Sequence, residues 1–156
     1  MTTKIDYTFP IKALRKMPDP IDDSKLSRYF AVVNVSDLPS DIPMETNPRK
    51  QNLKTQVAKK IAEGLLGHES GQLFHLLNRG LLISADSVSF DNKNNQLTLK
   101  LPNKEKHGLV DGGHTYKIIL ENKQNMAFDQ FITIEIMTGI EEDFQQSRAR
   151  EILLFK

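Results

Sequence analysis

The chain has 156 residues, 38% of them hydrophobic and 26% charged, with a formal net charge of +1. This length suits one globular domain with a sizeable core, while the near-zero charge gives no global electrostatic argument for a nucleic-acid or membrane partner. The absence of cysteine excludes disulfides, thiol nucleophiles and cysteine-ligated zinc. The sequence has no signal-peptide core, and no apolar run approaches the roughly 20 residues that span a bilayer. We therefore predict a cytoplasmic protein without a membrane partner.

The N-terminal segment is interpreted as an arm that leads into the domain. An isolated apolar patch from Tyr7 to Leu14 is followed by two prolines, which interrupt regular structure. The run from Tyr29 to Val35 is rich in β-branched and aromatic residues and predicts a strand, after which a proline-containing stretch predicts a long loop. We therefore predict an arm over residues 1–28 and one domain over residues 29–156.

A helix is predicted over residues 53–66, with Asn52 as its N-cap and Gly67 as its stop. Apolar residues recur there at the spacing of a helix with one buried stripe. The stripe comprises Leu53, Val57, Ala58, Ile61, Ala62 and Leu65. No acidic residue occurs between Thr46 and Ala62, so we expect a basic surface, whose lysines either lie solvated in water or bind phosphate. Its basic residues are Arg49, Lys50, Lys54, Lys59 and Lys60.

The remaining elements follow from alternation, turn residues and helical spacing. They are a strand from Leu81, a β-hairpin with its turn at residues 91–95, a short strand at 108–110, a helix at 115–121 and a strand at 131–137. This order predicts an α/β (α+β) domain with a small mixed sheet and a few helices.

The most informative segment is residues 107–120, which combine a short apolar run, a glycine-rich turn and the start of a helix. The first N–H groups of a helix lack intrahelical acceptors, so phosphates favour such a place. Gly112 and Gly113 would permit close approach of a ligand, while His114 and Thr115 would add side-chain donors or acceptors. The purely structural alternative is an ordinary turn in which Asp111 caps the helix.

Several enzyme and nucleotide-site classes lack their motifs. The four histidines show no H-E-x-x-H or similar zinc-ligand spacing, and G-x-S-x-G is absent. No pair of carboxylates has a spacing typical of a glycosidase. Neither the Walker motif nor the G-x-G-x-x-G fingerprint is present, so any nucleotide site is of another kind.

Three polar turns precede predicted elements and are candidates to converge. They are Asn47-Pro48-Arg49, Asn78-Arg79-Gly80 and the turn from Asp111 to Thr115. Two guanidinium groups beside a helix N-terminus would suit a phosphate or a nucleotide. Each turn also has a structural alternative: a pre-helix turn, an arginine paired with a structural carboxylate, and His114 as a capping residue.

The blocks that carry these turns resemble the N-terminal region of the abortive-infection phage-resistance (AIPR) family of bacterial proteins. The blocks read NPRKQNLKTQVAKKIAEGLL, FHLLNRGLLISADSVSFDNKNNQLTL and GLVDGGHTYKII, and the likeness covers roughly residues 30–140. DGGHT is also similar to the DGQHR motif of proteins linked to DNA modification and restriction, and more loosely to the ParB and sulfiredoxin group. In that group a glycine-containing turn before a helix binds nucleotide phosphates. This looser resemblance implies a ParB/sulfiredoxin-like fold for the present chain.

This chain departs from these patterns in one residue and in length. Thr115 stands where the DGQHR and ParB-like motifs carry arginine, whereas threonine suits the AIPR pattern. AIPR proteins are considerably longer, so we expect a domain truncated at the C-terminus, whether as a natural fragment, a truncated product or an isolated domain.

The first functional hypothesis is a phage-defence domain that binds a nucleotide or a nucleic-acid phosphate, with Mg²⁺ as the accompanying cofactor. The expected ligand-binding residues are Asn47, Arg49, Asn78, Arg79, Gly112, Gly113, Thr115 and Lys117. Asp111 and His114 are the catalytic candidates, and Asp111 is the candidate metal ligand. DNA contact through the basic helix would weaken steeply with salt.

Two other functions are left open. A non-enzymatic interaction or regulatory module would use the arm and the terminal segment from Ile152 to Phe155 to bind a protein partner or a second copy of the chain. A metal-dependent nuclease would use Asp111, His114 and Glu135, provided that these groups lie close together.

Overall fold

The computed structural model describes residues 4–21, 25–47 and 54–139. The strands are β1 (Asp6–Pro10), β2 (Ala13–Met17), β3 (Ser27–Asn34), β4 (Leu81–Ala85), β5 (Ser87–Asp91), β6 (Gln96–Lys100), β7 (Gly108–Asp111) and β8 (Phe131–Thr138). The helices are α1 (Gln56–Leu66), α2 (Phe74–Leu77) and α3 (Gly113–Asn122), with 3-10 turns η1 (Val35–Asp37) and η2 (Lys123–Asn125). No helix of these described segments combines the length and the apolar character needed to cross a membrane.

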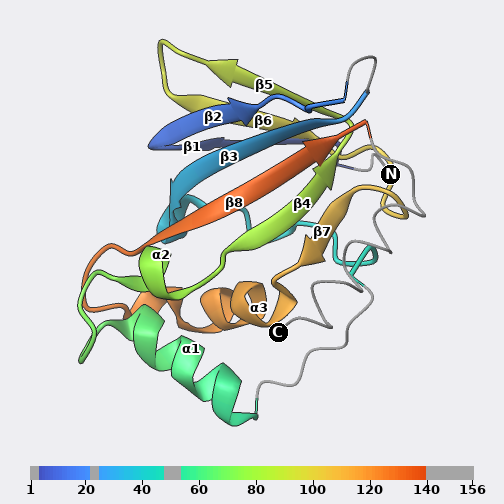
Figure 1. Ribbon diagram of the computed structural model, residues 1–156. Coiled ribbons are helices and arrows are strands. Elements are labelled where there is room, and N and C mark those ends of the chain that lie inside the picture. Colours follow the sequence, from blue (N-terminus) through green and yellow to red (C-terminus); the bar gives the residue numbers. More distant parts are fainter. Residues whose placement is uncertain (1–3, 22–24, 48–53, 140–156) are drawn as a thin grey trace.

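The strands form a five-stranded sheet in the order β2-β3-β8-β4-β7 and a three-stranded sheet in the order β1-β6-β5. Strands β4 and β8 are parallel and the other pairs are antiparallel, so the larger sheet is mixed. The three helices lie on one side of this sheet (Figure 1). The predicted α+β class with a small mixed sheet and helices is confirmed.

One hydrophobic core joins both sheets and the helices. Along β8 the residues Ile132, Ile134 and Ile136 are fully buried in it, while Thr133 and Glu135 alternate on the opposite face. This period of two is the pattern from which the strand was predicted. The predicted hairpin is also confirmed, since β5 pairs with β6 across the turn at residues 91–95.

The N-terminal segment, predicted to be an arm, contributes a strand to each sheet. Strand β1 pairs with β6, and β2 pairs with β3 at the edge of the larger sheet. Tyr7 and Phe9 are buried in the common core. The apolar patch therefore forms part of the domain, because it pairs with β6 and β3 and packs into the common core.

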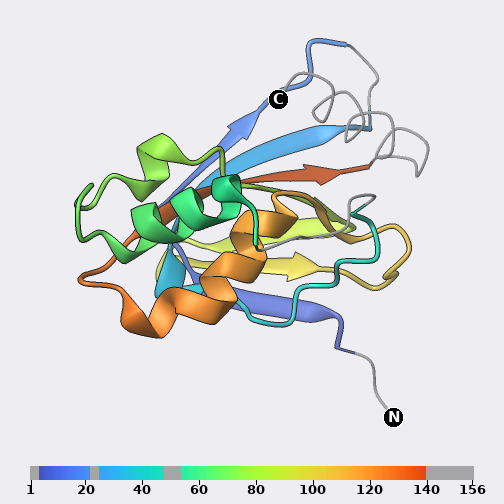
Figure 2. The same cartoon turned by 90° about the horizontal axis from the view of Figure 1, so that it is seen from below.

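Helix α1 begins one turn later than predicted and ends as predicted. Thr55 is its N-cap and accepts a hydrogen bond from the Ala58 N–H at 3.1 Å, whereas Asn52 lies outside the described residues. Gly67 ends the helix in the left-handed conformation with φ of +79°. Val57 does not belong to the buried stripe, since 67% of its surface is exposed. Helices α1 and α3 run side by side and begin at the same end, as Figure 2 shows.

Candidate functional site

A cavity of about 390 Å³ lies where α1 and α3 begin, and we call it the helix-start cavity. It is lined by Asn47, Thr55, Val57, Ile61, Asp111, Gly112, Gly113, His114 and Thr115. Two of the three predicted turns therefore meet at this cavity, since Asn47 belongs to the first turn and residues 111–115 form the third. The structure adds Thr55, Val57 and Ile61 at the start of α1, none of which was predicted to contact a ligand.

The start of α3 carries no side-chain cap among the described residues. Its N-cap is Gly112, with φ of +91°, so the alternative in which Asp111 caps the helix is wrong. A Cβ atom at Gly112 would lie 2.7 Å from the Gly80 carbonyl oxygen. The close contact with the neighbouring turn therefore leaves no room for a side chain at position 112, whether or not a ligand approaches.

The side chain of Asn78 joins the Asn78-Arg79-Gly80 turn to α3. Its Nδ2 donates to the Thr115 hydroxyl at 2.9 Å, and its Oδ1 accepts from the Gly80 N–H at 2.8 Å. Gly80 itself has φ of +85°, and a Cβ atom there would lie 1.9 Å from the Thr133 carbonyl oxygen. Asn78 and Thr115, both predicted to contact ligand, hold two segments of the protein together.

A second cavity of about 310 Å³ lies beside the first and shares Asp111 with it. We call it the Phe30 cavity; it is lined by Phe30, Arg79, Gly80, Leu81, Leu82, Asp111, Thr133 and Glu135. Arg79 therefore lines the Phe30 cavity and not the helix-start cavity, and Asp111 lies between the two. Arg79 is exposed and makes no hydrogen bond or ion pair with the described part of the chain.

The remaining predicted residues lie elsewhere. Lys117 is exposed on α3 and lines neither cavity, and Arg49 lies outside the described residues. Glu135 lines only the Phe30 cavity and pairs with Arg28 at 2.8 Å. Within the described ranges, no group of three or more histidine and carboxylate side chains could hold a metal ion.

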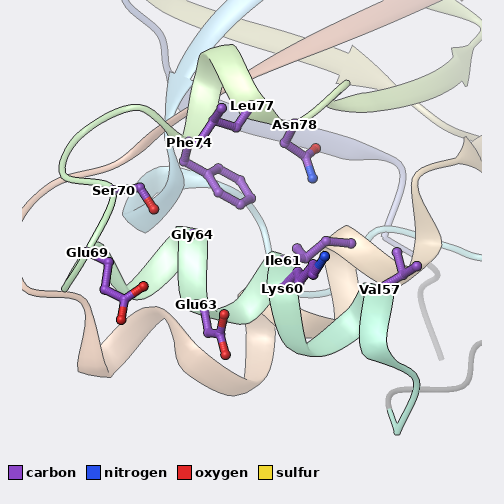
Figure 3. A pocket seen from close by; sticks show the side chains of 10 residues that line it. All are labelled: Val57, Lys60, Ile61, Glu63, Gly64, Glu69, Ser70, Phe74, Leu77 and Asn78. Atoms are coloured by element: carbon purple, nitrogen blue, oxygen red, sulfur yellow. The ribbon is translucent and has the colours of Figure 1, made fainter.

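A third cavity, of about 420 Å³, lies between α1 and α2 and was not predicted (Figure 3). Its apolar lining includes Val57, Ile61, Phe74 and Leu77. We call it the α1–α2 groove. Leu77, which lines the groove, is 66% exposed, and the preceding residue of α2, Leu76, is 71% exposed. Helix α2 was not among the predicted elements, so this surface was not anticipated.

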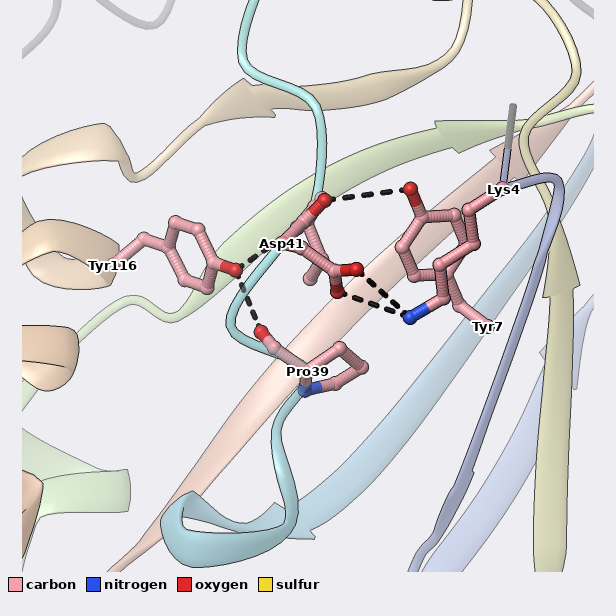
Figure 4. A network of polar contacts seen from close by, with 6 residues as sticks. Lys4, Tyr7, Pro39, Asp41 and Tyr116 are labelled. Atoms are coloured by element: carbon pink, nitrogen blue, oxygen red, sulfur yellow. Dashed lines mark hydrogen bonds and ion pairs between the residues drawn. The ribbon is translucent and has the colours of Figure 1, made fainter. Parts of the chain in front are cut away.

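The loop before α1 is fixed to α3 by Tyr116 (Figure 4). The Tyr116 hydroxyl donates to the Pro39 carbonyl oxygen at 2.6 Å and accepts from the Ile42 N–H at 3.1 Å. Burial raises the pKa of Tyr116 to about 12, so the hydroxyl keeps its proton at neutral pH. The ion pair between Lys4 and Asp41, at 2.9 Å, ties the same loop to the N-terminal segment.

This loop also carries Asn47 to the helix-start cavity. The Thr46 hydroxyl donates to the Leu109 carbonyl oxygen at 2.7 Å, and the Leu109 N–H donates to the Pro43 carbonyl oxygen at 2.8 Å. Both bonds reach β7, the strand that ends at Asp111. The two sides of the cavity are therefore connected by hydrogen bonds, and their relative position is set by the fold.

Comparison with known proteins identifies the family of this chain. No curated protein and no solved structure matches the chain, so the likeness to ParB and sulfiredoxin stays a prediction. A family model described as AIPR protein matches residues 44–150, a range that includes the described lining of the helix-start cavity. This match covers more than half of the chain and confirms the resemblance seen in the sequence. The chain belongs to the AIPR family, the abortive-infection phage-resistance proteins.

Proposed function

We propose that the chain acts in abortive-infection phage defence, which its family suggests, by binding a nucleotide or nucleic-acid phosphate in the helix-start cavity. The observation that supports this proposal is that two helices open into one cavity. Helix α1 has 11 residues and α3 has 10, and the first residues of both line the cavity. Each helix start carries roughly half a positive charge, so an anion placed there is attracted by both.

Asp111 gives this site a place for a divalent cation. A carboxylate beside a phosphate repels it, whereas Mg²⁺ binds one or two carboxylates together with phosphate oxygens. No all-protein cage of three ligands exists in the described chain, which suits an ion that arrives with the nucleotide. We therefore assign Asp111 to Mg²⁺ and His114 to hydrogen bonding with the ligand. Turnover, if present, would use the same two side chains.

Thermal unfolding with ATP, CTP, GTP and a short DNA duplex, each with and without Mg²⁺, tests the proposal. The variant Val57→Asp places a negative charge in the cavity at an exposed position. Aspartate near a helix start favours folding, so this variant should repel the phosphate without unfolding the chain. Val57→Asn is the neutral control of the same shape.

At least one ligand should raise the unfolding midpoint of the wild type and of Val57→Asn, and raise that of Val57→Asp far less. The proposal fails if no ligand shifts the wild type, or if the two variants respond equally. Cleavage of nucleic acid that survives Asp111→Ala would likewise remove the nuclease role of Asp111.

The α1–α2 groove favours a second candidate function, self-association as an interaction module. Exposed leucines beside an apolar groove are typical of a surface that binds protein. Sedimentation over a range of protein concentrations should then show a dimer that Leu76→Ser and Leu77→Ser disrupt. A chain that stays monomeric at all concentrations contradicts this candidate.

A further inference from the structure

The Phe30 cavity lies on the face of the larger sheet opposite the described helices (Figure 1). In β3, Ala31 and Val33 are buried in the core, so Phe30, directly before Ala31, faces the other way. The strand registers then place Phe30 opposite Glu135, Glu135 opposite Leu82, and Leu82 opposite Asp111. These four residues form a row across β3, β8, β4 and β7, and all four line the cavity.

This row offers the groups that bind a planar, polar molecule. The Arg28 guanidinium lies 5.2 Å from the centre of the Phe30 ring and is fixed by its ion pair with Glu135. Aromatic rings and guanidinium planes are the surfaces on which nucleobases stack. Arg79 adds an exposed cation that makes no ion pair within the described chain. A volume of about 310 Å³ is at the lower end of the range for small-molecule sites.

We infer that the ligand is a nucleoside phosphate that occupies both cavities. This inference rests on the proposed function: the phosphates lie in the helix-start cavity and the base lies against Phe30. Asp111 lines both cavities and stands between the two parts of the ligand. Arg79 contacts the sugar or the nearest phosphate. The site therefore distinguishes a nucleotide from a phosphate chain that carries no base.

Calorimetric titration with two probes tests this inference. Inorganic tripolyphosphate can fill only the helix-start cavity, whereas ATP, GTP, CTP or UTP can fill both. Since stacking of one base is worth about 1–3 kcal/mol, the preferred nucleotide should bind about tenfold or more tightly than tripolyphosphate. Phe30→Leu keeps an apolar residue in the strand but removes the ring, and should weaken nucleotide binding about tenfold while leaving tripolyphosphate binding unchanged.

The control variant is Phe128→Leu, which removes an aromatic ring that is 40% exposed and lines neither cavity. It should leave both affinities unchanged. If tripolyphosphate and every nucleotide bind equally, and Phe30→Leu changes neither, the inference is overturned while the proposed phosphate site stands. If neither kind of probe binds the wild type, the proposed function itself fails.

Discussion

The turn at Asn78-Arg79-Gly80 and the turn from Asp111 to Thr115 look alike in sequence but differ in what their polar groups contact. In the first turn, the Asn78 amide is engaged by the protein itself, through Gly80 and Thr115. Of the three residues of that turn, Arg79 alone is exposed. In the second turn, every residue lines the helix-start cavity.

This difference separates the structural role of one polar turn from the ligand-binding role proposed for the other. The first turn holds the second in place, because Asn78 reaches Thr115 and the Gly80 carbonyl group meets Gly112. These contacts between the two turns account for the presence of Asn78 and Gly80 without a shared ligand. Substitutions in the two turns should therefore have different effects on stability and on binding.

The largest expected effect is that of Gly80→Ala. The new Cβ would lie 1.9 Å from a backbone oxygen of β8 at a positive φ, so we expect a loss of about 3–5 kcal/mol in the free energy of unfolding. Gly71→Ala is the matched control: its φ is also positive, at +69°, but no atom lies within 4 Å of the new Cβ. It should cost only about 1–2 kcal/mol in urea denaturation. Equal losses would show that Gly80 is not tightly packed.

Asn78→Ala should have the next largest effect. It removes two hydrogen bonds and leaves the Gly80 N–H without its acceptor, which costs about 2 kcal/mol. Arg79→Gln, at the neighbouring exposed position, should change stability by less than about 0.5 kcal/mol. A double-mutant cycle with Thr115→Val measures the link between the turns directly. If Asn78→Ala and Arg79→Gln are equally mild, Asn78 does not hold the turns together.

Tyr116→Phe tests how helix α3 is fixed to the loop before α1. The variant loses the bond to Pro39 and leaves the Ile42 N–H without an acceptor, so we expect a loss of about 1–2 kcal/mol. Burial raises the pKa of Tyr116 to about 12, above its ordinary value of 10.0. The folded chain therefore holds a proton that the unfolded chain releases, and wild-type stability falls as the pH rises from 10 to 12.

Thermal melts at high pH should show a smaller fall for Tyr116→Phe than for the wild type. Part of the fall should remain, because burial also raises the pKa of Tyr7. Identical slopes in the two proteins would show that Tyr116 ionises as freely when folded as when unfolded.

The smallest expected effect concerns His107, which lies directly before β7. Burial lowers its pKa below the ordinary value of 6.5, and its Nδ1 accepts from the Asn103 N–H at 3.3 Å. Below pH 6.5 the unfolded chain binds a proton more readily than the folded chain, so stability falls as the pH is lowered. His107→Gln should flatten the dependence of the unfolding midpoint on pH between 6.5 and 5. An unchanged slope contradicts this assignment.

The sequence predicted elements whose signals are local. Helix α1 with its stop at Gly67, the β5–β6 hairpin and strand β8 follow from periodicity and turn residues within a few positions. Strands β1 and β2 were missed because each has only five residues and so little periodicity of its own, and because the partner of β1, β6, lies far along the chain.

The candidate site was predicted in part for the same reason. A helix start with a glycine turn is a local feature, so the turn that opens α3 was predicted. The bond from Asn78 to Thr115 and the meeting of α1 with α3 depend on how distant segments pack. The sequence of one turn cannot specify which of its polar groups form hydrogen bonds with distant segments of the protein.

The most direct test of the phosphate site is a titration of the ¹⁵N-labelled chain with tripolyphosphate and ATP, followed through its backbone amide NMR signals. The account predicts saturable shifts at the amides of residues 112–115 and of residues 55–57, which open the two helices. Val57→Asn should retain these shifts and Val57→Asp should lose them. Saturable shifts confined to other surfaces, or no shifts with either ligand, would contradict the account.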